Sequence, residues 1–491
     1  MRAQDTRTGS GRAVVVGGGI AGLAAAHRLL AAGVEVTVLE ASERLGGKLL
    51  PGEIAGARVD LGAESMLARR PEAVALAREV GLADRLAPPA TATASIWTRG
   101  ALRPMPKGHV MGVPGTASAL AGLLSDEGLR RIERDAELPR TEIGDDVAVG
   151  AYVAERLGRE VVDRLVEPLL GGVYAGDAYR ISMRSAVPQL FQAARAHDSL
   201  TEAVRDIQDK AARGTQTGPV FMGVTGGVGR LPLAVAESVR ARGGEIVTGA
   251  PVTELRRTGP LERPGARWRI VAGDRVLHAD AVVLALPAPA AAALLRTEAP
   301  AAAAELAVVE YASMALITLA YDRRDAALPE GSGFLVPPVD GRTIKASTFA
   351  SRKWAWIEKE NPGLLVVRTS VGRYGETEVL DRDDEDLVDV SRHDLREATG
   401  LSAAPVATRV TRWDDGLPQY PVGHHARVAR VREHVAALPG LAVCGAAYDG
   451  VGIPACIASA YAAVDALGGD RGGLDALSAN PVQSLHGGAG E

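Results

Sequence analysis

A glycine motif near the amino terminus constrains the fold more than any other feature of the sequence. The motif, Gly17-x-Gly19-x-x-Gly22, directly follows the apolar run 13–16. Residues 20–32 then show helical periodicity, and residues 34–39 alternate like a second strand. A strand, a tight turn, a helix and another strand within about thirty residues make a β-α-β unit. We therefore expect a parallel sheet that begins at this motif.

The chemistry of this turn points to a dinucleotide. Glycines let the backbone approach a diphosphate, and the helix N-terminus directs free N–H groups and the positive end of its dipole toward it. Glu40 stands 23 residues after Gly17, where an acid accepts hydrogen bonds from ribose hydroxyls and disfavours a 2′-phosphate. FAD and NAD both fit, whereas NADP fits poorly. The candidate cofactor-binding residues of this unit are Gly17, Gly19, Ile20, Ala21, Gly22, Glu40 and Ala41.

A second motif favours FAD over NAD. Arg44-x-Gly46-Gly47-Lys48 resembles the second signature of the glutathione-reductase-like flavoprotein superfamily, in which a cation and glycines close over the diphosphate. A basic hairpin turn would explain the two glycines but not their position after Glu40. In that superfamily the loop at 60–65 passes beside the flavin ring and contacts it through its backbone. The resemblance thus adds the candidates Arg44, Gly47, Lys48, Gly62, Ala63, Glu64 and Ser65.

The carboxy-terminal glycine-rich run 445–452 precedes a helix that we expect from about Pro454 to Leu467. Pro454 falls in the first helical turn, where its missing N–H has no cost. The N-terminus of this helix could face the flavin pyrimidine and stabilise negative charge that develops at N1 and O2. A plain helix cap is the alternative. The candidates here are Gly445, Gly452, Ile453 and Pro454.

Three separated stretches of α/β pattern indicate a nucleotide-binding domain that is discontinuous in sequence. The predicted fold class is α/β, with a discontinuous Rossmann-like FAD-binding domain, an inserted α+β substrate domain and a helical domain. The substrate domain contains β-rich runs such as Met314–Tyr321 and Leu364–Val371. The expected ranges are 1–70, 217–287 and 425–467 for the FAD-binding domain, 71–108 and 288–424 for the substrate domain, 109–216 for the helical domain, and 468–491 for a flexible tail.

Composition excludes several classes of function. A formal net charge of -5 over 491 residues does not suit a nucleic-acid-binding protein. Two cysteines, Cys444 and Cys456, are too few for a disulfide framework or a thiolate metal site. His424 and His425 lack a third ligand at useful spacing, so we expect no metal site there either. The run 1–12 lacks the apolar core of a secretory signal, and no apolar run reaches the ~18 residues of a spanning helix. We expect a cytoplasmic protein and leave open a peripheral membrane contact through an amphipathic face.

Several longer runs resemble the protoporphyrinogen/coproporphyrinogen oxidase family over about residues 12–467. The Pro-Met-Pro-Lys-Gly sequence in particular resembles the branch of Gram-positive-type bacteria that oxidises coproporphyrinogen III. The runs that carry the resemblance are 102–114, 171–177, 348–354, Trp413 with 417–424, and 445–454.

The resemblance implies FAD-dependent oxidation of a porphyrinogen to the porphyrin, with six electrons passed to O2 and H2O2 formed. A hydride leaves a meso carbon toward the flavin, and aromatisation drives the reaction, so orientation matters more than a strong base. The resemblance also leaves open a hand-off of the product to a ferrochelatase. Since the terminal run differs from that of amine oxidases with a cysteine-tethered flavin, we expect noncovalent FAD.

Family alignment implies further contacts with cofactor and substrate. Val252 corresponds to a position whose backbone meets the adenine, and Trp413 to one near the flavin, although both could be core residues. The implied substrate residues are Arg70 as a cation for propionates, Gly171 and Gly172 on the cavity floor, and Lys345 and Tyr420 on its walls. Four alternatives stay open: a protoporphyrinogen IX oxidase, an amine oxidase, a carotenoid desaturase, or a flavin-binding protein without turnover.

Overall fold

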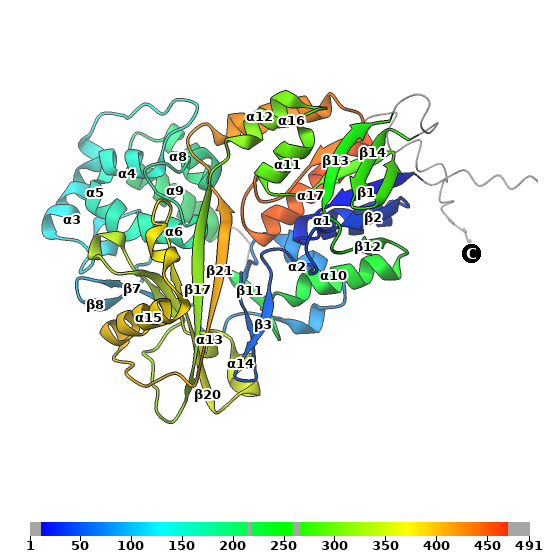
Figure 1. Cartoon of the computed structure of the whole chain (residues 1–491). Helices are drawn as coiled ribbons and strands as arrows, with labels where there is room; N and C mark the ends of the chain where they lie inside the picture. The colour runs from blue at the N-terminus through cyan, green and yellow to red at the C-terminus, as the bar shows by residue number, and fades with distance from the viewer. Residues whose placement is uncertain (1–10, 214–217, 259–265, 470–491) are drawn as a thin grey trace, which may run out of the picture.

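The computed structural model describes residues 11–213, 218–258 and 266–469 (Figure 1). Its nucleotide-binding unit is built on a five-stranded sheet with the order β12-β2-β1-β16-β22, in which every neighbouring pair is parallel. The sequence supplies these strands from three separate stretches, which confirms the discontinuous α/β fold. The strands are β1 (Arg12–Val16), β2 (Glu35–Leu39), β12 (Glu245–Val247), β16 (Ala281–Leu284) and β22 (Leu441–Val443).

Both faces of this sheet are buried, because successive side chains of each strand point to opposite sides. Ala13 and Val15 lie in one core with helices, whereas Val14 and Val16 lie in another with a small antiparallel sheet and further helices. Burial on both faces explains why β1 reads as an unbroken apolar run. The first cover consists of α1 (Ile20–Ala31), α2 (Pro71–Glu79), α10 (Arg230–Ala241) and α17 (Ile453–Gly469). The second consists of β13 (Val252–Arg257), β14 (Trp268–Ala272), β15 (Arg275–Ala279), α11 (Ala288–Leu295), α12 (Pro300–Ala307) and α16 (His424–Ala436).

A seven-stranded sheet forms the second unit, with the order β21-β17-β20-β19-β18-β7-β8. Its neighbours are antiparallel except for β18 and β7, which run parallel. The long strands β17 and β21 cross the middle of the molecule (Figure 1). The strands are β7 (Ala94–Thr98), β8 (Ala101–Pro104), β17 (Tyr311–Asp322), β18 (Gly333–Leu335), β19 (Ile344–Thr348), β20 (Leu364–Val371) and β21 (Ala407–Pro418).

The two faces of this sheet pack against different elements. On one face, Ile317 and Leu319 lie in one core with Leu387 and Leu395 of α15 (Asp384–Thr399). On the other face, Ala320 and Val366 belong to a core shared with the β3–β4 hairpin and two short helices. This second core joins the sheet to the nucleotide-binding unit. Its elements are β3 (Pro51–Ile54), β4 (Ala57–Asp60), α13 (Ala350–Lys353) and α14 (Ala355–Glu360).

A helical unit packs around its own core, which runs from Val110 to Val204 and also includes Tyr420. Arg156 is fully buried there and donates to Asp135, so this core contains a satisfied ion pair. The helices are α3 (Asp126–Glu133), α4 (Val149–Leu157), α5 (Arg159–Val161), a π-helical turn η4 (Val162–Val166), α6 (Glu167–Tyr174), α7 (Met183–Ala186), α8 (Pro188–Ala196) and α9 (Leu200–Arg213).

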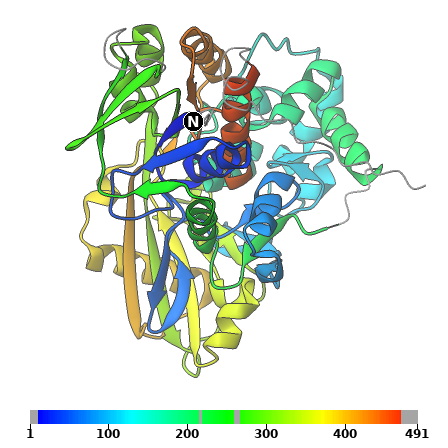
Figure 2. The same cartoon turned by 90° about the vertical axis from the view of Figure 1, so that its right-hand side faces the viewer.

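Short elements complete the described chain. They are β5 (Met66–Leu67), β6 (Leu86–Ala87), β9 (His109–Val110), β10 (Val113–Pro114) and β11 (Phe221–Val224), with the turns η1 (Ala83–Arg85), η2 (Ala117–Leu120), η3 (Arg134–Glu137), η5 (Pro338–Asp340) and η6 (Glu378–Asp381). Figure 2 shows α17 in red against the blue amino-terminal unit, so the two ends of the described chain meet. Within the described ranges, every helix is too short or too polar to cross a bilayer.

The predicted domain boundaries stay predictions, but the packing refines one of them. Buried residues of α2 lie in the core with α1 and α17, although the predicted boundary at residue 71 would separate them. Most of the predicted tail, 468–491, lies outside the described residues, and its first two residues extend α17. Residues 1–10, 217 and 259–265 of the predicted FAD-binding ranges, and 214–216 of the predicted helical range, also lie outside the described residues.

Candidate active site

The glycine turn between β1 and α1 is closed by contacts that leave no room for a side chain at two of its positions. A Cβ on Gly17, whose φ is +110°, would lie 2.4 Å from the carbonyl oxygen of Ala285. A Cβ on Gly22 would lie 1.9 Å from the carbonyl oxygen of Gly17. These two glycines let the first turn of α1 pack directly on the strand ends of the parallel sheet.

Gly19 lacks a side chain for a different reason. Its φ is -73°, and a Cβ there would have only the Cα of Gly47 within 4.0 Å. Neither backbone conformation nor protein packing requires glycine at this position, so the missing side chain leaves room for a group from outside. The helical hydrogen bonds begin with Leu23 N–H to Gly19 O, at 3.0 Å. The N–H groups of Ile20, Ala21 and Gly22 precede that bond and are available at the positive end of the helix.

Glu40 directly follows β2 and lies beside this turn. One carboxylate oxygen accepts from Gly18 N–H at 2.6 Å, and the other accepts from the N–H and hydroxyl of Ser42 at 2.9 and 2.8 Å. The side chain is half-buried, so lone pairs remain for further donors such as ribose hydroxyls. Ala41, which follows, is exposed. Glu40 therefore supports the turn and could also hold the cofactor.

The second motif lies against the first. Gly46 N–H donates to Gly18 O at 2.9 Å, and Gly19 and Gly46 form a parallel bridge. Gly47 has a φ of +57°, and its carbonyl accepts from the Arg44 guanidinium at 2.9 Å. The structure thus brings Gly17–Gly22 and Arg44–Lys48 together, as the sequence predicts for a diphosphate site.

Trp413 of β21 reaches this loop from the seven-stranded sheet. Its indole N–H donates to Leu61 O at 3.0 Å, and the charged groups of Arg44 and Lys48 lie 5.9 and 5.4 Å from its rings. Burial and the neighbouring Arg44 lower the pKa of Lys48 below its ordinary value. Two cations held beside an aromatic face suit an anion that arrives with the cofactor.

The loop at 62–65 follows β4 and lies next to Trp413. A Cβ on Gly62 would lie 2.1 Å from Lys48 O and 3.1 Å from the Trp413 ring, so this position admits only glycine. Ala63 is exposed, and its N–H donates to Lys48 O at 3.3 Å. Glu64 and Ser65 are half-buried. The loop therefore exposes backbone beside the two glycine motifs.

The carboxy-terminal segment meets the first helix. A Cβ on Gly445 would lie 3.9 Å from the Cβ of Ala21, so this strand end faces the start of α1. Helix α17 begins at Ile453, with Pro454 as its second residue, and Cys456 N–H donates to Gly452 O. Gly452 is exposed, and a Cβ there would meet nothing closer than 3.9 Å. The predicted helix is confirmed, and its N-terminus lies open.

Val252 begins β13, two residues beyond Ala250, whose N–H donates to Glu40 O at 2.8 Å. Val252 is half-buried and pairs with Ala272. The predicted adenine-contacting position therefore lies close to the ribose acid, on a short antiparallel sheet that covers the parallel one.

The predicted substrate residues come from different units. Gly171 and Gly172 lie on α6, where a Cβ on Gly171 would have nothing within 4 Å and one on Gly172 would lie 3.6 Å from Leu335. Arg70 caps α2, pairs with Glu72 at 2.9 Å and leaves 42% of its side chain exposed. Its charge also acts on the thiol of Cys456 in α17. Arg70 thus lies on the side of the molecule where α17 begins.

Lys345 and Tyr420, the two predicted wall residues, are buried. The ammonium of Lys345 donates to Gly372 O at 2.6 Å, and burial with the nearby Arg373 lowers its pKa to about 7. The hydroxyl of Tyr420 donates to Ala446 O, and its ring stacks on His424 with centroids 4.1 Å apart. Both side chains therefore hold neighbouring backbone in this structure.

The residues present fit FAD. Glycines at 19 and 452 leave space that protein atoms do not fill, the cations Arg44 and Lys48 lie beside Trp413, and Glu40 stands at the predicted ribose position. Four segments supply this cradle: the turn after β1 and the loops after β2 and β4, which are close in sequence, and the start of α17, which is far from them in sequence.

Sequence reasoning missed the ion cluster that anchors the 62–65 loop. Glu64 binds Lys353 of α13 at 2.6 Å and Arg368 of β20 at 3.0 Å, and all three side chains are at most 18% exposed. Burial alone would raise the pKa of Glu64, but Arg368 and Lys353 outweigh it and hold that pKa at about 2. The run 348–354 singled out in the sequence contains Lys353, whereas no local signal marks Arg368.

Comparisons with known proteins agree with this geometry. Residues 20–468 match the family described as flavin containing amine oxidoreductase. A putrescine oxidase structure aligns with 93% of this chain and 99% of its own at a TM-score of 0.68 and 16% identity, which shows the fold alone. A crystal structure from Exiguobacterium sp. 255-15, provisionally named protoporphyrinogen oxidase, is 33% identical and aligns with 93% of this chain and 98% of its own at a TM-score of 0.80.

Curated relatives cover nearly the whole chain. The coproporphyrinogen III oxidase of Mycobacterium tuberculosis (strain ATCC 25618 / H37Rv) is 38% identical over 92% of this chain and 96% of its own. That of Bacillus subtilis (strain 168) is 33% identical over 94% and 98%, and the protoporphyrinogen oxidase of Bos taurus is 31% identical over 91% and 97%. These relatives confirm the resemblance drawn from the sequence runs. This chain belongs to the flavin containing amine oxidoreductase family.

Proposed function

We propose that this protein oxidises coproporphyrinogen III to coproporphyrin III in haem biosynthesis, with noncovalent FAD as its cofactor and O2 as the final acceptor. The observation that carries the proposal is similarity over more than nine-tenths of both chains to relatives named coproporphyrinogen III oxidase, at 33–38% identity in Bacillus subtilis and Mycobacterium tuberculosis. The overall change removes six hydrogens from the porphyrinogen and converts three O2 to three H2O2. We place the protein in the cytoplasm.

In this proposal the chain holds the cofactor by its adenylate and diphosphate groups. Glu40 accepts from the ribose hydroxyls, and the N–H groups at the start of α1 donate to the diphosphate, which Arg44 and Lys48 neutralise. Bound FAD supplies the acceptor for hydride from the substrate's meso carbons and returns electrons to O2. The open N-terminus of α17 would direct a positive dipole end toward the flavin pyrimidine.

The substrate-facing residues orient the macrocycle. The glycines of α6 leave space that a tetrapyrrole could use, and Arg70 is a partly exposed cation suited to a propionate. Removal of an N–H proton accompanies the loss of hydride, and aromatisation drives both, so the chain needs to fix orientation and exclude alternative poses. No strong base is part of the proposal.

The two thiols support noncovalent cofactor binding. Cys444 and Cys456 are buried, burial raises the pKa of each thiol, and that of Cys456 reaches about 12. A thiol that stays protonated is a poor nucleophile. Acid precipitation should therefore release a yellow supernatant, and colour that stays with the pellet would show a covalent link.

Side-by-side turnover tests the proposal. Coproporphyrinogen III and protoporphyrinogen IX are incubated aerobically with the holoprotein, and porphyrin fluorescence and peroxide are followed against an autoxidation control. We expect kcat/KM for coproporphyrinogen III to exceed that for protoporphyrinogen IX at least tenfold. Fluorescence no faster than autoxidation with either substrate would refute the proposal.

Protoporphyrinogen IX oxidase is the second candidate function. It is favoured by the 31% identical bovine relative and by the Exiguobacterium structure. The same assay decides, because a preference for protoporphyrinogen IX would replace the first proposal with the second. Primary amines and phytoene serve as further substrates that address the amine oxidase and carotenoid desaturase alternatives. A coloured protein that oxidises none of these substrates would favour the flavin-binding protein without turnover.

A further inference from the structure

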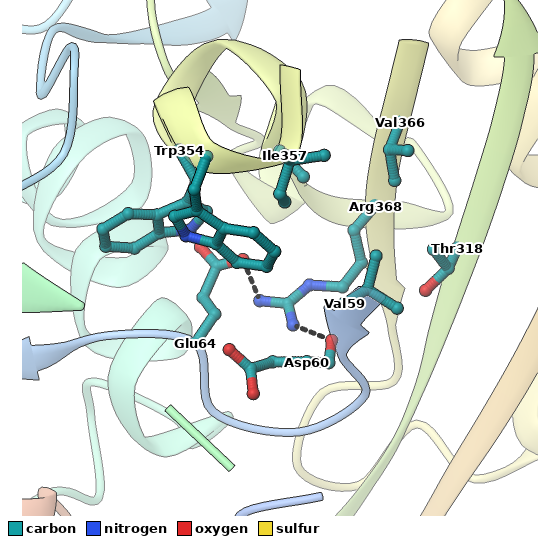
Figure 3. A pocket seen from close by; sticks show the side chains of 10 residues that line it. Val59, Asp60, Glu64, Thr318, Trp354, Ile357, Val366 and Arg368 are labelled. Carbon is teal, nitrogen blue, oxygen red and sulfur yellow. Dashed lines mark hydrogen bonds and ion pairs between the residues drawn. The ribbon is translucent and has the colours of Figure 1, made fainter. Parts of the chain in front are cut away.

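Figure 3 shows a small pocket between the nucleotide-binding unit and the seven-stranded sheet, where the guanidinium of Arg368 lies between Glu64 and Asp60. Most of its other walls are apolar and include Val59, Ile357 and Val366, and Thr318 adds one hydroxyl. Buried charge in such surroundings is expensive unless each group is paired. These buried charged groups are therefore stable only if each one is paired with an oppositely charged or hydrogen-bonding group.

The guanidinium of Arg368 binds one short segment, residues 60–64. One guanidinium nitrogen donates to Gly62 O at 2.8 Å and to Asp60 O at 3.2 Å, while the other lies 3.0 Å from the Glu64 carboxylate. Lys353 donates to the second oxygen of that carboxylate at 2.6 Å. Two cations from the substrate side thus fix both backbone and side chain of the segment 60–64.

The same segment is also tied to the nucleotide-binding side. The carboxylate of Asp60 accepts from Val228 N–H and Gly229 N–H, each at 2.8 Å, just before α10. Burial and the nearby Glu64 raise the pKa of Asp60 to about 6, although its two backbone donors and Arg368 oppose the shift. The start of the loop is therefore anchored to one unit and its middle to the other.

We propose that Lys353 and Arg368 are positioning residues for the flavin-facing loop: Lys353 acts on it through Glu64, and Arg368 acts both through Glu64 and directly on the carbonyls of Asp60 and Gly62. The proposal rests on the proposed flavin contacts of Gly62–Ser65. Buried ion clusters of this kind add little net stability compared with apolar packing, but they fix geometry. Lys353 and Arg368 belong to the substrate unit, so the loop beside the flavin is set by the domain that holds the substrate.

The first test compares Lys353→Met with the charge-conserving Lys353→Arg. A matched control is Arg58→Met, because the Arg58–Glu360 pair at 2.7 Å also joins β4 to the substrate unit but lies in solvent, away from the loop. Holoprotein is ultrafiltered at falling concentrations to obtain the FAD dissociation constant, and visible circular dichroism reports the flavin environment.

We expect Lys353→Met to raise the FAD dissociation constant at least tenfold and to change the visible dichroism. Lys353→Arg should stay within about threefold, and Arg58→Met within about twofold, of the wild type. A folded Lys353→Met protein with a dissociation constant and a spectrum like those of the wild type would overturn the proposal.

The isosteric variant Glu64→Gln provides a second route if Lys353→Met does not fold. It should raise the dissociation constant at least fivefold, and a value within twofold of the wild type would also overturn the proposal. In the double variant Glu64→Gln/Lys353→Met the effects should not multiply, because Lys353 acts through Glu64. If the two effects on the dissociation constant multiplied fully, Lys353 would not act through Glu64.

These outcomes separate the inference from the proposed function. A wild-type protein that holds FAD but oxidises no porphyrinogen would refute the proposed function and leave this test intact. Normal porphyrinogen turnover by the wild type, with normal FAD retention by Lys353→Met and Glu64→Gln, would refute only the positioning role.

Discussion

In the turn after β1, a Cβ on Gly22 would lie 1.9 Å from another backbone atom, whereas on α6 a Cβ on Gly171 would have no such neighbour within 4 Å. Both glycines lie in helices and belong to the candidate active site. The first is required by the protein's own packing, so it is part of the fold. The second is not, and in the proposed function the macrocycle accounts for its missing side chain. Of these two glycines, the one on the cofactor side is specified by protein packing, and the one on the substrate side is not.

Gly22→Ala is the strongest way to break this comparison. The added methyl group must displace the backbone at Gly17, and overpacking of this kind costs roughly 3 kcal/mol. We expect the purified protein to lack FAD and its thermal midpoint to fall by several degrees. Absorbance at 450 nm and calorimetry measure both. A yellow, fully stable variant would show that the turn can relax and that our distinction between the two glycines is unsound.

Glu40→Ala tests the cofactor side without a steric clash. It removes the acceptor of Gly18 N–H and of Ser42, together with the proposed ribose contact. Since hydrogen bonds to charged groups contribute about 1.5–3 kcal/mol, FAD affinity should fall roughly tenfold to a hundredfold. Equilibrium dialysis gives the constant, with Glu43→Ala as an exposed neighbouring control. Unchanged FAD retention would refute the role of this carboxylate.

Gly171→Ala sharpens the comparison from the substrate side. Alanine favours a helix interior over glycine by up to about 1 kcal/mol, and no protein atom opposes the methyl group, so stability should stay equal or rise slightly. KM for coproporphyrinogen III should increase several-fold if α6 faces the macrocycle, while the FAD dissociation constant stays unchanged. Steady-state kinetics decides, and an unaltered KM would remove Gly171 from the proposed substrate surface.

The smallest expected effect is a pair of opposite pH dependences. Burial lowers the pKa of His424 from 6.5 to about 4. Between these two pH values protons bind mainly to the unfolded chain, so the stability of the folded chain decreases as the pH decreases. Burial raises the pKa of Asp60 to about 6, so between pH 6 and 4 protons bind mainly to the folded chain and stability rises as pH falls. In the wild type these contributions partly cancel.

Single substitutions should separate the two contributions. His424→Asn removes the contribution that falls in acid, so the free energy of unfolding should rise relative to that of the wild type as the pH falls. Asp60→Asn removes the opposing contribution, so the free energy of unfolding should fall relative to that of the wild type. Urea denaturation at intervals from pH 4.5 to 7 measures the slopes. Equal slopes in both variants would show that burial does not control these groups as described.

Much of the fold could be predicted because its signals are local. The periodicities of residues 20–32 and 314–321 correspond to α1 and β17, and Pro454 marks the first turn of α17. The cofactor motifs were also predictable, since a positive φ at Gly17 and a close approach at Gly22 restrict single positions. The packing of α2 against α17 was not, because an amphipathic helix does not reveal which core it joins.

The substrate side was harder to predict for the same reason. Lys345 and Tyr420 were chosen through family resemblance, and the structure places both in buried positions where they bind backbone carbonyls. No local pattern distinguishes a buried lysine with one carbonyl partner from a lysine that faces a cavity. Their predicted contacts with substrate stay predictions.

The sequence by itself determined that the chain starts a parallel sheet with a glycine turn, a helix and an acidic strand end, because those features depend on backbone conformation within about thirty residues. Only the tertiary structure decided how Lys353 and Arg368 meet Glu64. These three residues are separated by up to 304 positions in the chain, and a buried charge finds its partner through the packing of two domains rather than through neighbouring sequence.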